Sequence, residues 1–267
     1  MHLLSVGDTY KEPLPCARAE NQTIAERPGL HRYAPPQGEP ELLRAVQGRL
    51  AELGGDVPLE RIQIASGATS GLTVVAESLL MPGDEVLLPS PYWPLIRGII
   101  ASRGATPLEV PLFDRMTGLE PSAIEEALEA ACSEKTVALY INTPHNPTGA
   151  MLSEAQLGAF ARVAERHDLW IIADEAYQDL YFEQPATPPW LRDDMRERTI
   201  ASHTLSKSYG IAGSRIGYLH GPEDAMKAII AVQTFSTYCA PRPMQFGAAA
   251  VLREGGDWLR ERREEYA

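Results

Sequence analysis

Residues 202–221, SHTLSKSYGIAGSRIGYLHG, place a single amine among hydroxyl groups, glycines and apolar side chains. Lys207 stands between two serines, and the next positive charge, Arg215, follows eight positions later. Small residues let a ligand approach the backbone, hydroxyl groups hydrogen-bond its oxygen atoms, and a guanidinium favours an anion. The segment therefore predicts a site for an anionic ligand with an amine beside it. Taken alone, it also fits a polar passage from strand to loop whose lysine reaches solvent.

The composition excludes several classes of partner. The 267 residues carry a formal net charge of −12 and are 44% hydrophobic, which is typical of a globular protein with a large core. Nucleic acids and anionic membranes both require basic patches, so neither is expected as a partner. The three cysteines, Cys16, Cys132 and Cys239, are far apart and form no CxxC pair, which favours a reduced, cytoplasmic protein.

Targeting and metal-binding patterns are also missing from the sequence. The start, MHLLSVGDTY, has no basic region followed by a long apolar run, so no signal peptide is expected. No apolar run reaches the length needed to span a membrane. The six histidines show no metal-ligand spacing, and we expect no structural metal.

Apolar segments of strand length alternate with amphipathic segments of helical length. The predicted strands are 62–66, 85–90, 106–112, 136–142, 169–174, 199–206 and 214–221. The predicted helices are 39–55, 71–80, 95–104, 122–132, 153–167 and 223–233. This order predicts an α/β fold with a mainly parallel sheet, helices on both faces and three layers, α/β/α. The proline-rich segment 183–190 is expected to be an exposed loop.

Ligands of such sheets bind beyond the carboxyl ends of the strands, and small residues stand after the first predicted strand. Gly67, Ala68 and Thr69 follow residues 62–66 and lead into a helix. Free N–H groups and the positive end of the helix dipole at that point suit a phosphate. By themselves these residues also fit an ordinary turn between strand and helix.

Polar residues stand at the same edge after three later strands. Asn146 follows the strand 136–142 between two prolines, and Asp174 ends the strand 169–174, with Tyr177 three residues on. Lys207 and Arg215 follow the strand 199–206. Taken singly, Asn146 fits a turn former, Asp174 a helix N-cap and Arg215 a surface ion pair. Their coincidence at one edge of one sheet favours a joint binding site.

A phosphorylated heteroaromatic aldehyde suits this set of groups. The Lys207 amine can form a Schiff base with an aldehyde, and the Asp174 carboxylate can keep a pyridine nitrogen protonated. Asn146 and Tyr177 can hydrogen-bond a ring hydroxyl. The groups that can hold the phosphate are Gly67, Ala68, Thr69, Thr204 or Ser206, and Arg215. The ligand with these features is pyridoxal 5′-phosphate.

Several longer motifs carry a family resemblance. They are SVGDTYKEPLP, YAPPQGEPELLRAV, ASGATSGL, PSPYWP, NTPHNPTGAMLS, DEAY, TLSKSYGIAGSRIGY and QTFSTYCAPRPMQ. In this order the chain resembles the class I/II aminotransferases of the fold-type I pyridoxal-phosphate superfamily. The resemblance implies that Lys207 holds the cofactor as a Schiff base and acts as the base for the proton shift. It also implies that Asp174 pairs with the pyridinium nitrogen, and that Asn146 and Tyr177 contact the O3′ side.

Two aromatic residues gain roles from the resemblance. Trp93, in PYWP, falls where an aromatic side chain stacks on the cofactor ring; the alternative is a tryptophan of the core. Tyr33, in HRYAPPQG, matches a tyrosine that reaches the phosphate from the other subunit of a homodimer. The alternative for Tyr33 is an aromatic residue packed in an interface.

The chain departs from the family at both ends. Family members carry an N-terminal arm before SVGDT and a C-terminal small domain whose arginine binds the substrate α-carboxylate. No residue here takes that role, so we expect either a fragment or a protein that has lost part of its active site. Residues 1–35 are expected to form an N-terminal segment with dimer contacts, 36–254 the cofactor-binding large domain, and 255–267 the start of a helix leading to the small domain.

The implied activity is that of an aminotransferase, which moves an amino group between an amino acid and a 2-oxo acid by a ping-pong route. A β-lyase, decarboxylase or cyclase of the same fold would share the cofactor contacts. A non-catalytic binding or regulatory module is a third possibility. Release of pyruvate and ammonia separates a lyase from a transaminase, and covalent cofactor binding with bleaching by an amino acid separates an enzyme from a binding module.

Overall fold

The computed structural model describes residues 11–18, 21 and 27–267, and this part of the chain contains one seven-stranded sheet. Its strands are β1 (Ile62–Ala65), β2 (Glu85–Ser90), β3 (Thr106–Pro111), β4 (Thr136–Asn142), β5 (Trp170–Asp174), β6 (Thr199–Thr204) and β7 (Gly217–His220). The order across the sheet is β1-β7-β6-β5-β4-β2-β3. Only β7 runs antiparallel to its neighbours, β1 and β6. The prediction of a mainly parallel sheet is confirmed.

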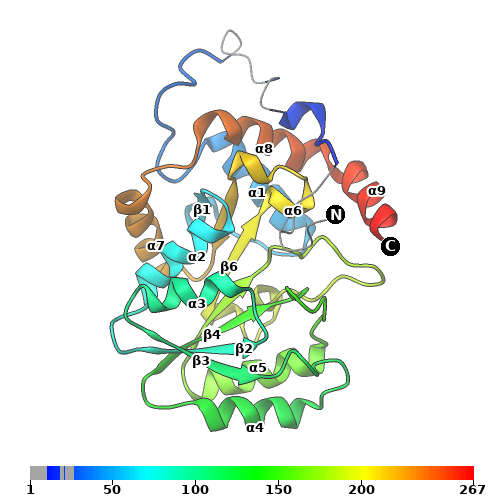
Figure 1. Cartoon of the computed structure of the whole chain (residues 1–267). Helices are drawn as coiled ribbons and strands as arrows, with labels where there is room; N and C mark the ends of the chain where they lie inside the picture. The colour runs from blue at the N-terminus through cyan, green and yellow to red at the C-terminus, as the bar shows by residue number, and fades with distance from the viewer. Residues whose placement is uncertain (1–10, 19–20, 22–26) are drawn as a thin grey trace, which may run out of the picture.

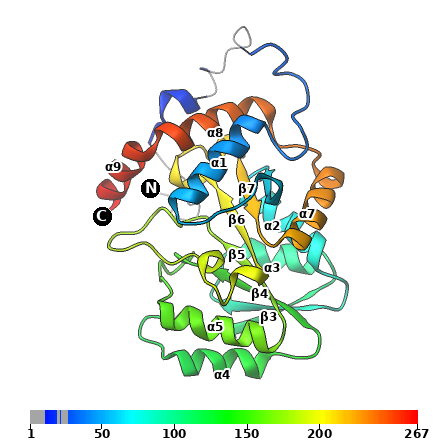
Figure 2. The same ribbon diagram turned by 180° about the vertical axis from the view of Figure 1, so that it is seen from behind.

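Helices cover both faces of this sheet (Figures 1 and 2). They are α1 (Pro40–Glu52), α2 (Ala68–Leu79), α3 (Pro94–Ala101), α4 (Pro121–Ala131), α5 (Glu154–Arg166), α6 (Leu205–Ser208), α7 (Glu223–Ser236), α8 (Arg242–Glu254) and α9 (Gly256–Tyr266). The helices α2, α3 and α7 share one apolar core with the sheet. The helices α1 and α8, and separately α4 and α5, pack on the other face. The three-layer α/β/α arrangement is therefore confirmed.

Strand β4 shows why the central strands are apolar throughout. Ala138 and Tyr140 pack with the α2 and α3 side, whereas Leu139 and Ile141 pack with α4 and α5. All four side chains are buried. Because successive side chains of a strand point to opposite faces, a sheet covered on both faces requires apolar residues at every position. The polar residues that do occur near the strand ends are therefore exceptions that need partners.

The start of α5 follows from a capping box. The Ser153 hydroxyl accepts a hydrogen bond from the Gln156 N–H at 3.3 Å, and the Ser153 N–H donates to Gln156 Oε1 at 3.0 Å. Gln156 Nε2 also donates to the carbonyl oxygens of Met116 and Leu119. The predicted helix start at residue 153 is thus fixed by satisfied backbone donors.

Three predictions from the sequence need correction. The helix α2 begins at Ala68, three residues earlier than expected, and α8 forms where no helix was predicted. Helix α8 buries Ala248, Ala249 and Val251 beside α1, and this tertiary packing stabilises it. The prediction of an exposed loop over 183–190 is wrong at the end of this segment, because Trp190 is only 6% exposed and belongs to the core.

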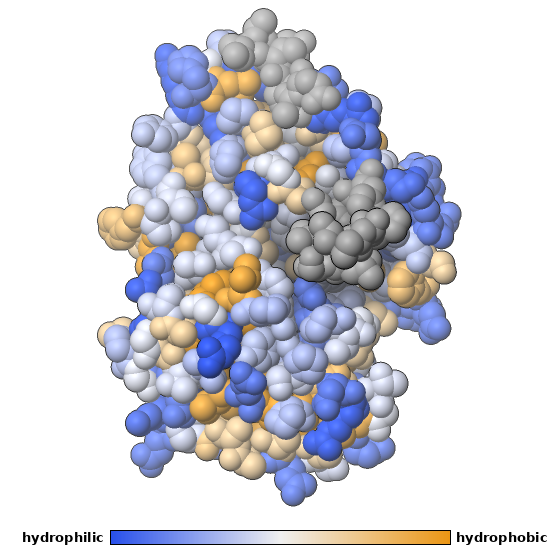
Figure 3. All heavy atoms as spheres, viewed as in Figure 1, coloured by the Kyte–Doolittle hydropathy of each residue, from blue (hydrophilic) through white to orange (hydrophobic). Residues whose placement is uncertain are grey.

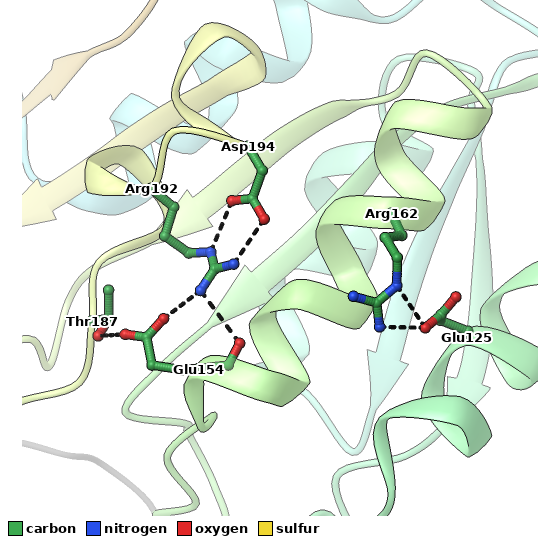
Figure 4. A network of polar contacts seen from close by, with 6 residues as sticks. All are labelled: Glu125, Glu154, Arg162, Thr187, Arg192 and Asp194. Carbon is green, nitrogen blue, oxygen red and sulfur yellow. Dashed lines mark hydrogen bonds and ion pairs between the residues drawn. The ribbon is translucent and has the colours of Figure 1, made fainter.

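Ion pairs fasten the segment that carries Trp190 to the start of α5 (Figure 4). Arg192 pairs with the carboxylate of Glu154 and donates to Asp194 at 2.7 and 2.9 Å. Thr187 also hydrogen-bonds Glu154. Since the carboxylates of this network are solvent-exposed, each contact contributes little. The buried indole is therefore the main anchor of the segment.

Two histidines lie side by side within the sheet. His203 of β6 and His220 of β7 are 1% and 2% exposed, and their Nε2 atoms are 2.9 Å apart. Trp190 meets the His220 ring edge-on, and Tyr218 stacks on His203. Burial lowers the pKa of His220 to about 3 and lowers that of His203 well below its usual value. Both rings are therefore neutral, one donating the shared hydrogen bond and the other accepting it.

The neutral histidine pair predicts a loss of stability in acid. Below pH 6.5 the two histidines bind protons in the unfolded chain but stay neutral in the folded protein. The free energy of unfolding therefore falls as the pH drops from 6.5 toward 3. Each histidine contributes a slope of about 1.4 kcal/mol per pH unit in that window. Urea unfolding between pH 4 and 7 should show a flatter pH dependence for His220→Gln.

The exposed His31 provides a control, His31→Gln, for the loss of an imidazole as such. A constant stability difference between wild type and His220→Gln across the whole pH range would contradict the neutral pair.

Candidate active site

A cavity of about 650 Å³ opens where β4, β5 and β6 end. It brings together ten of the twelve residues predicted from the sequence. From the first half of the chain these are Ala68, Thr69, Trp93 and Asn146. From the second half they are Asp174, Tyr177, Thr204, Ser206, Lys207 and Arg215. Strand order explains the meeting, because the parallel strands β4, β5 and β6 are neighbours and their carboxyl ends share one edge.

Gly67 does not line the cavity but lies directly against the Arg215 guanidinium. Its φ is +82°, and a Cβ at this position would stand 2.5 Å from Arg215 Nη2. Gly67 is also the N-cap residue of α2, so the N–H groups of the first helical turn, which have no partner within the helix, begin beside the same cation. Only glycine combines this backbone conformation with such a close approach. The helix start and the guanidinium thus form a cradle for an anion.

Backbone carbonyl groups hold the Arg215 side chain in place. Its backbone is left-handed, with φ at 53°, and Nη1 donates to the Ala212 carbonyl oxygen at 2.9 Å. A longer contact of 3.4 Å joins Nη2 to the Ser66 carbonyl oxygen. These bonds leave further guanidinium N–H groups available to a ligand, because a guanidinium carries five. These contacts therefore fix the orientation of the guanidinium before any ligand binds.

Lys207 lies on the single helical turn α6 that directly follows β6. The Thr204 hydroxyl caps this turn by accepting the Ser206 N–H at 3.2 Å, and it also donates to Ser206 Oγ at 2.9 Å. The cap fixes the direction in which the chain leaves the sheet. Thr204, Ser206 and Lys207 all line the same cavity.

Asp174 is a buried carboxylate with two donors. Tyr140 donates to Oδ2 at 2.7 Å, and the Ala176 N–H donates to Oδ1 at 3.1 Å. Burial raises the pKa of Asp174, and the two hydrogen bonds partly offset this rise. No helix follows Asp174, because residues 176–179 form a turn. The alternative of a helix N-cap is thus excluded.

Asn146 and Tyr177 lie beside Asp174. Asn146 Nδ2 donates to the Tyr177 hydroxyl at a long 3.4 Å. The Asn146 backbone N–H donates to Asn142 Oδ1, and Asn142 Nδ2 donates to the Asp174 carbonyl oxygen, both at 2.8 Å. Asn142 therefore ties the loop after β4 to the end of β5. A long contact such as that of Asn146 with Tyr177 is easily exchanged for a ligand atom.

Three polar residues near the cavity were not identified as site residues from the sequence. Asn142 and Tyr140 lie in β4, and Glu175 follows Asp174. Glu175 is 3% exposed, its Oε1 has no hydrogen-bond partner, and burial raises its pKa well above the usual value. The available signal was a polar group inside an apolar strand, since such groups need partners. The partners themselves lie on other strands and could not be read from spacing.

The two aromatic predictions have different outcomes. Trp93 lines the cavity at the start of α3, as expected of a residue that stacks on a ring. Tyr33 is 79% exposed and does not line it. Its ring lies 5.1 Å from that of Tyr238, edge to face. Within one chain, therefore, Tyr33 is separate from the site.

Comparison with known proteins identifies the family of the chain. A family model described as aminotransferase class I and II matches residues 1–267. An aspartate aminotransferase of Rhizobium meliloti is 33% identical over 242 residues, which cover 89% of this chain and 58% of that protein. An arginine–pyruvate transaminase of Pseudomonas aeruginosa is 32% identical over an alignment of 270 residues, gaps included, which covers 99% of this chain and 66% of that protein.

The fold has close counterparts among solved structures. The N-succinyldiaminopimelate aminotransferase of Mycobacterium tuberculosis superposes with a TM-score of 0.90 at 31% identity, covering 98% of this chain and 68% of that one. The chain spans about three fifths of the length of the curated relatives that it matches. Since the family model covers every residue, this chain belongs to the class I and II aminotransferase family.

Proposed function

We propose that this chain binds pyridoxal 5′-phosphate, the cofactor of its family, and that the protein transfers an amino group between an amino acid and a 2-oxo acid. The observation that carries the proposal is one cavity lined by a lysine amine, a buried carboxylate and a guanidinium. When bound, the cofactor supplies a protonated ring that withdraws electrons from the substrate Cα.

Lys207 is the proposed catalytic base. Its amine would condense with the aldehyde of the cofactor with loss of water and, once an amino acid has displaced it, would move a proton between the substrate Cα and C4′. The capped turn α6 supports this role, because it fixes the lysine next to the end of β6. A proton can be transferred efficiently only by a group held in this way.

Asp174 is proposed to hold the proton of the ring nitrogen. An ionised carboxylate in a buried place needs a positive partner, and a pyridinium provides one. Asn146 and Tyr177 would hydrogen-bond the O3′ side, replacing their long mutual contact. Trp93 would stack on the ring and exclude water from one face.

The phosphate is proposed to lie at the start of α2. The ligands would be the N–H groups of Ala68 and Thr69 with the Thr69 hydroxyl, the hydroxyl groups of Thr204 and Ser206, and the guanidinium of Arg215. The left-handed glycine Gly67 keeps this approach open. The helix dipole and the guanidinium would act on the same anion, which favours a phosphate at this place.

The relatives support amino transfer rather than a lyase, decarboxylase, cyclase or non-catalytic module. They are described as transaminases of aspartate, N-succinyldiaminopimelate and arginine. Because these amino acids differ in length and charge, we infer the reaction class for this chain and leave the amino acid open.

A homodimer is the second part of the proposal. Tyr33, Phe235 and Tyr238 are 79%, 88% and 44% exposed, and hydrophobic residues stand out at the edge formed by α7 in Figure 3. Exposed aromatic residues in one area favour burial against a second copy. Tyr33 would then reach the phosphate of the partner's site. The cytoplasmic location and the division at residues 1–35, 36–254 and 255–267 stay predictions.

Reduction with borohydride tests the role of Lys207. With pyridoxal phosphate bound, the protein should show a visible absorption band, and reduction should attach the cofactor to Lys207. Adding an amino acid before reduction should bleach the band and release a 2-oxo acid. Peptide mapping locates the label, and Lys207→Ala should prevent it, whereas Lys135→Ala at an exposed lysine should not. A label on another lysine would refute the assignment.

Substitution at Gly67 tests the phosphate cradle. Gly67→Ala should push Arg215 aside and weaken binding of pyridoxal phosphate roughly 10- to 100-fold, as expected for lost charge-assisted hydrogen bonds. Gly118→Ala is the control, because φ there is +79° but a Cβ would meet nothing within 4 Å. Fluorescence titration should show no such loss for pyridoxal, which lacks the phosphate. An equal loss for both ligands would contradict the cradle.

Mixed dimers test the role of Tyr33. If Tyr33 acts across the interface, pairing a Tyr33→Phe subunit with a Lys207→Ala subunit gives one normal site and one doubly defective site. Isolated heterodimers should then have about half the wild-type activity. If Tyr33 served its own subunit, each site would carry one defect and activity would be far lower. Tyr238→Phe in place of Tyr33→Phe controls for loss of the neighbouring hydroxyl.

A further inference from the structure

Tyr140 contacts the Asp174 carboxylate of the proposed site directly, although Tyr140 itself does not line the cavity. Its hydroxyl donates to Asp174 Oδ2 at 2.7 Å, and both side chains are buried, at 2% and 6% exposed. Asp174 lines the cavity, whereas Tyr140 does not. The phenol therefore approaches the carboxylate on the side away from the ligand.

The sheet register explains this contact. Tyr140 pairs with Ile172, and Asp174 lies two residues further along β5, on the same face. Such diagonal neighbours lie within reach of an aromatic side chain. The ring of Tyr140 packs in the core under α2 and α3, so the hydroxyl cannot turn to solvent. Its direction is thus set by packing.

The chemistry of the pair favours a fixed donor. Burial and the neighbouring Asp174 charge raise the pKa of Tyr140 well above its usual value, so the phenol stays protonated. The other carboxylate oxygen accepts the Ala176 N–H. Each oxygen therefore has one protein donor, and its remaining lone pairs are available to a group in the cavity.

We propose that Tyr140 is a positioning residue that holds the Asp174 carboxylate in place and lowers its basicity, so that the shared proton stays on the cofactor ring nitrogen. This inference rests on the proposed function for the identity of the ligand, and on this chain alone for the contact of Tyr140 with Asp174. A more basic Asp174 would draw the proton toward itself and weaken the electron-withdrawing ring.

Carbon-13 NMR of labelled aspartate carboxyl groups tests the contact without cofactor. The Asp174 signal is assigned by its loss in Asp174→Asn. Tyr140→Phe removes one oxygen and should raise the pKa of Asp174 by about one pH unit or more, as expected for losing a hydrogen bond to a charged group. The other titratable groups beside Asp174 are Glu175, Tyr177 and Lys207, and they are unchanged in this variant.

Tyr218→Phe is the matched control, because Tyr218 is equally buried but stacks on His203. It should leave the pKa of Asp174 unaltered. Incorporating 3-fluorotyrosine at position 140 strengthens the donor while keeping the shape, so the pKa should move down instead. This second change keeps the test decisive if Tyr140→Phe does not fold.

The proton itself is followed with pyridoxal phosphate labelled with nitrogen-15 in the ring. In Tyr140→Phe the ring nitrogen signal should move toward the value of the unprotonated ring. Failure of the wild type to bind the cofactor would refute the proposed function and leave the carboxyl titration to decide on Tyr140. An unchanged Asp174 pKa and ring signal in Tyr140→Phe, with cofactor bound, would overturn the inference alone.

Discussion

The proposed site depends on keeping one carboxylate, Asp174, charged inside a sheet that is covered on both faces. Burial disfavours the charged form and raises the pKa, and donors from Tyr140 and Ala176 partly offset this rise. Neither donor is charged, so the remaining electrostatic need is for a cation. The fold therefore creates a buried carboxylate that is stabilised by a cation, and a protonated ring nitrogen would supply one.

Parallel strands supply the geometry for the rest of the site. Asn142, Asp174 and Ser202 are aligned across β4, β5 and β6, so the loops that follow these strands begin at one edge. Glycines then set how closely the helices approach. A Cβ at Gly71 of α2 would stand 3.3 Å from Ser202 Oγ, and one at Gly67 would meet Arg215. The anion cradle thus depends on backbone close to a cation.

Sequence alone was most informative where one physical rule dominates. Runs such as 136–142 and 85–90 gave the strand bounds because both faces of the sheet are buried. The burial of Trp190 and the existence of helix α8 were not predicted, because tertiary packing determines both. Tyr140 was not identified from the sequence for a related reason. Its role comes from Asp174 on a neighbouring strand, and the spacing of residues along the chain does not show which strands are adjacent.

The adjacent acids Asp174 and Glu175 are both buried, but they differ in their hydrogen-bond partners. Asp174 has two donors and faces the cavity, whereas Glu175 lies near Asp179, whose charge is already paired with Arg49 of α1. Burial, together with the like charges of Asp174 and Asp179 beside it, raises the pKa of Glu175 well above its usual value and so favours the protonated form. Keeping Glu175 neutral leaves Asp174 as the carboxylate that the cavity presents to a ligand, which concentrates the field on one atom of the proposed cofactor.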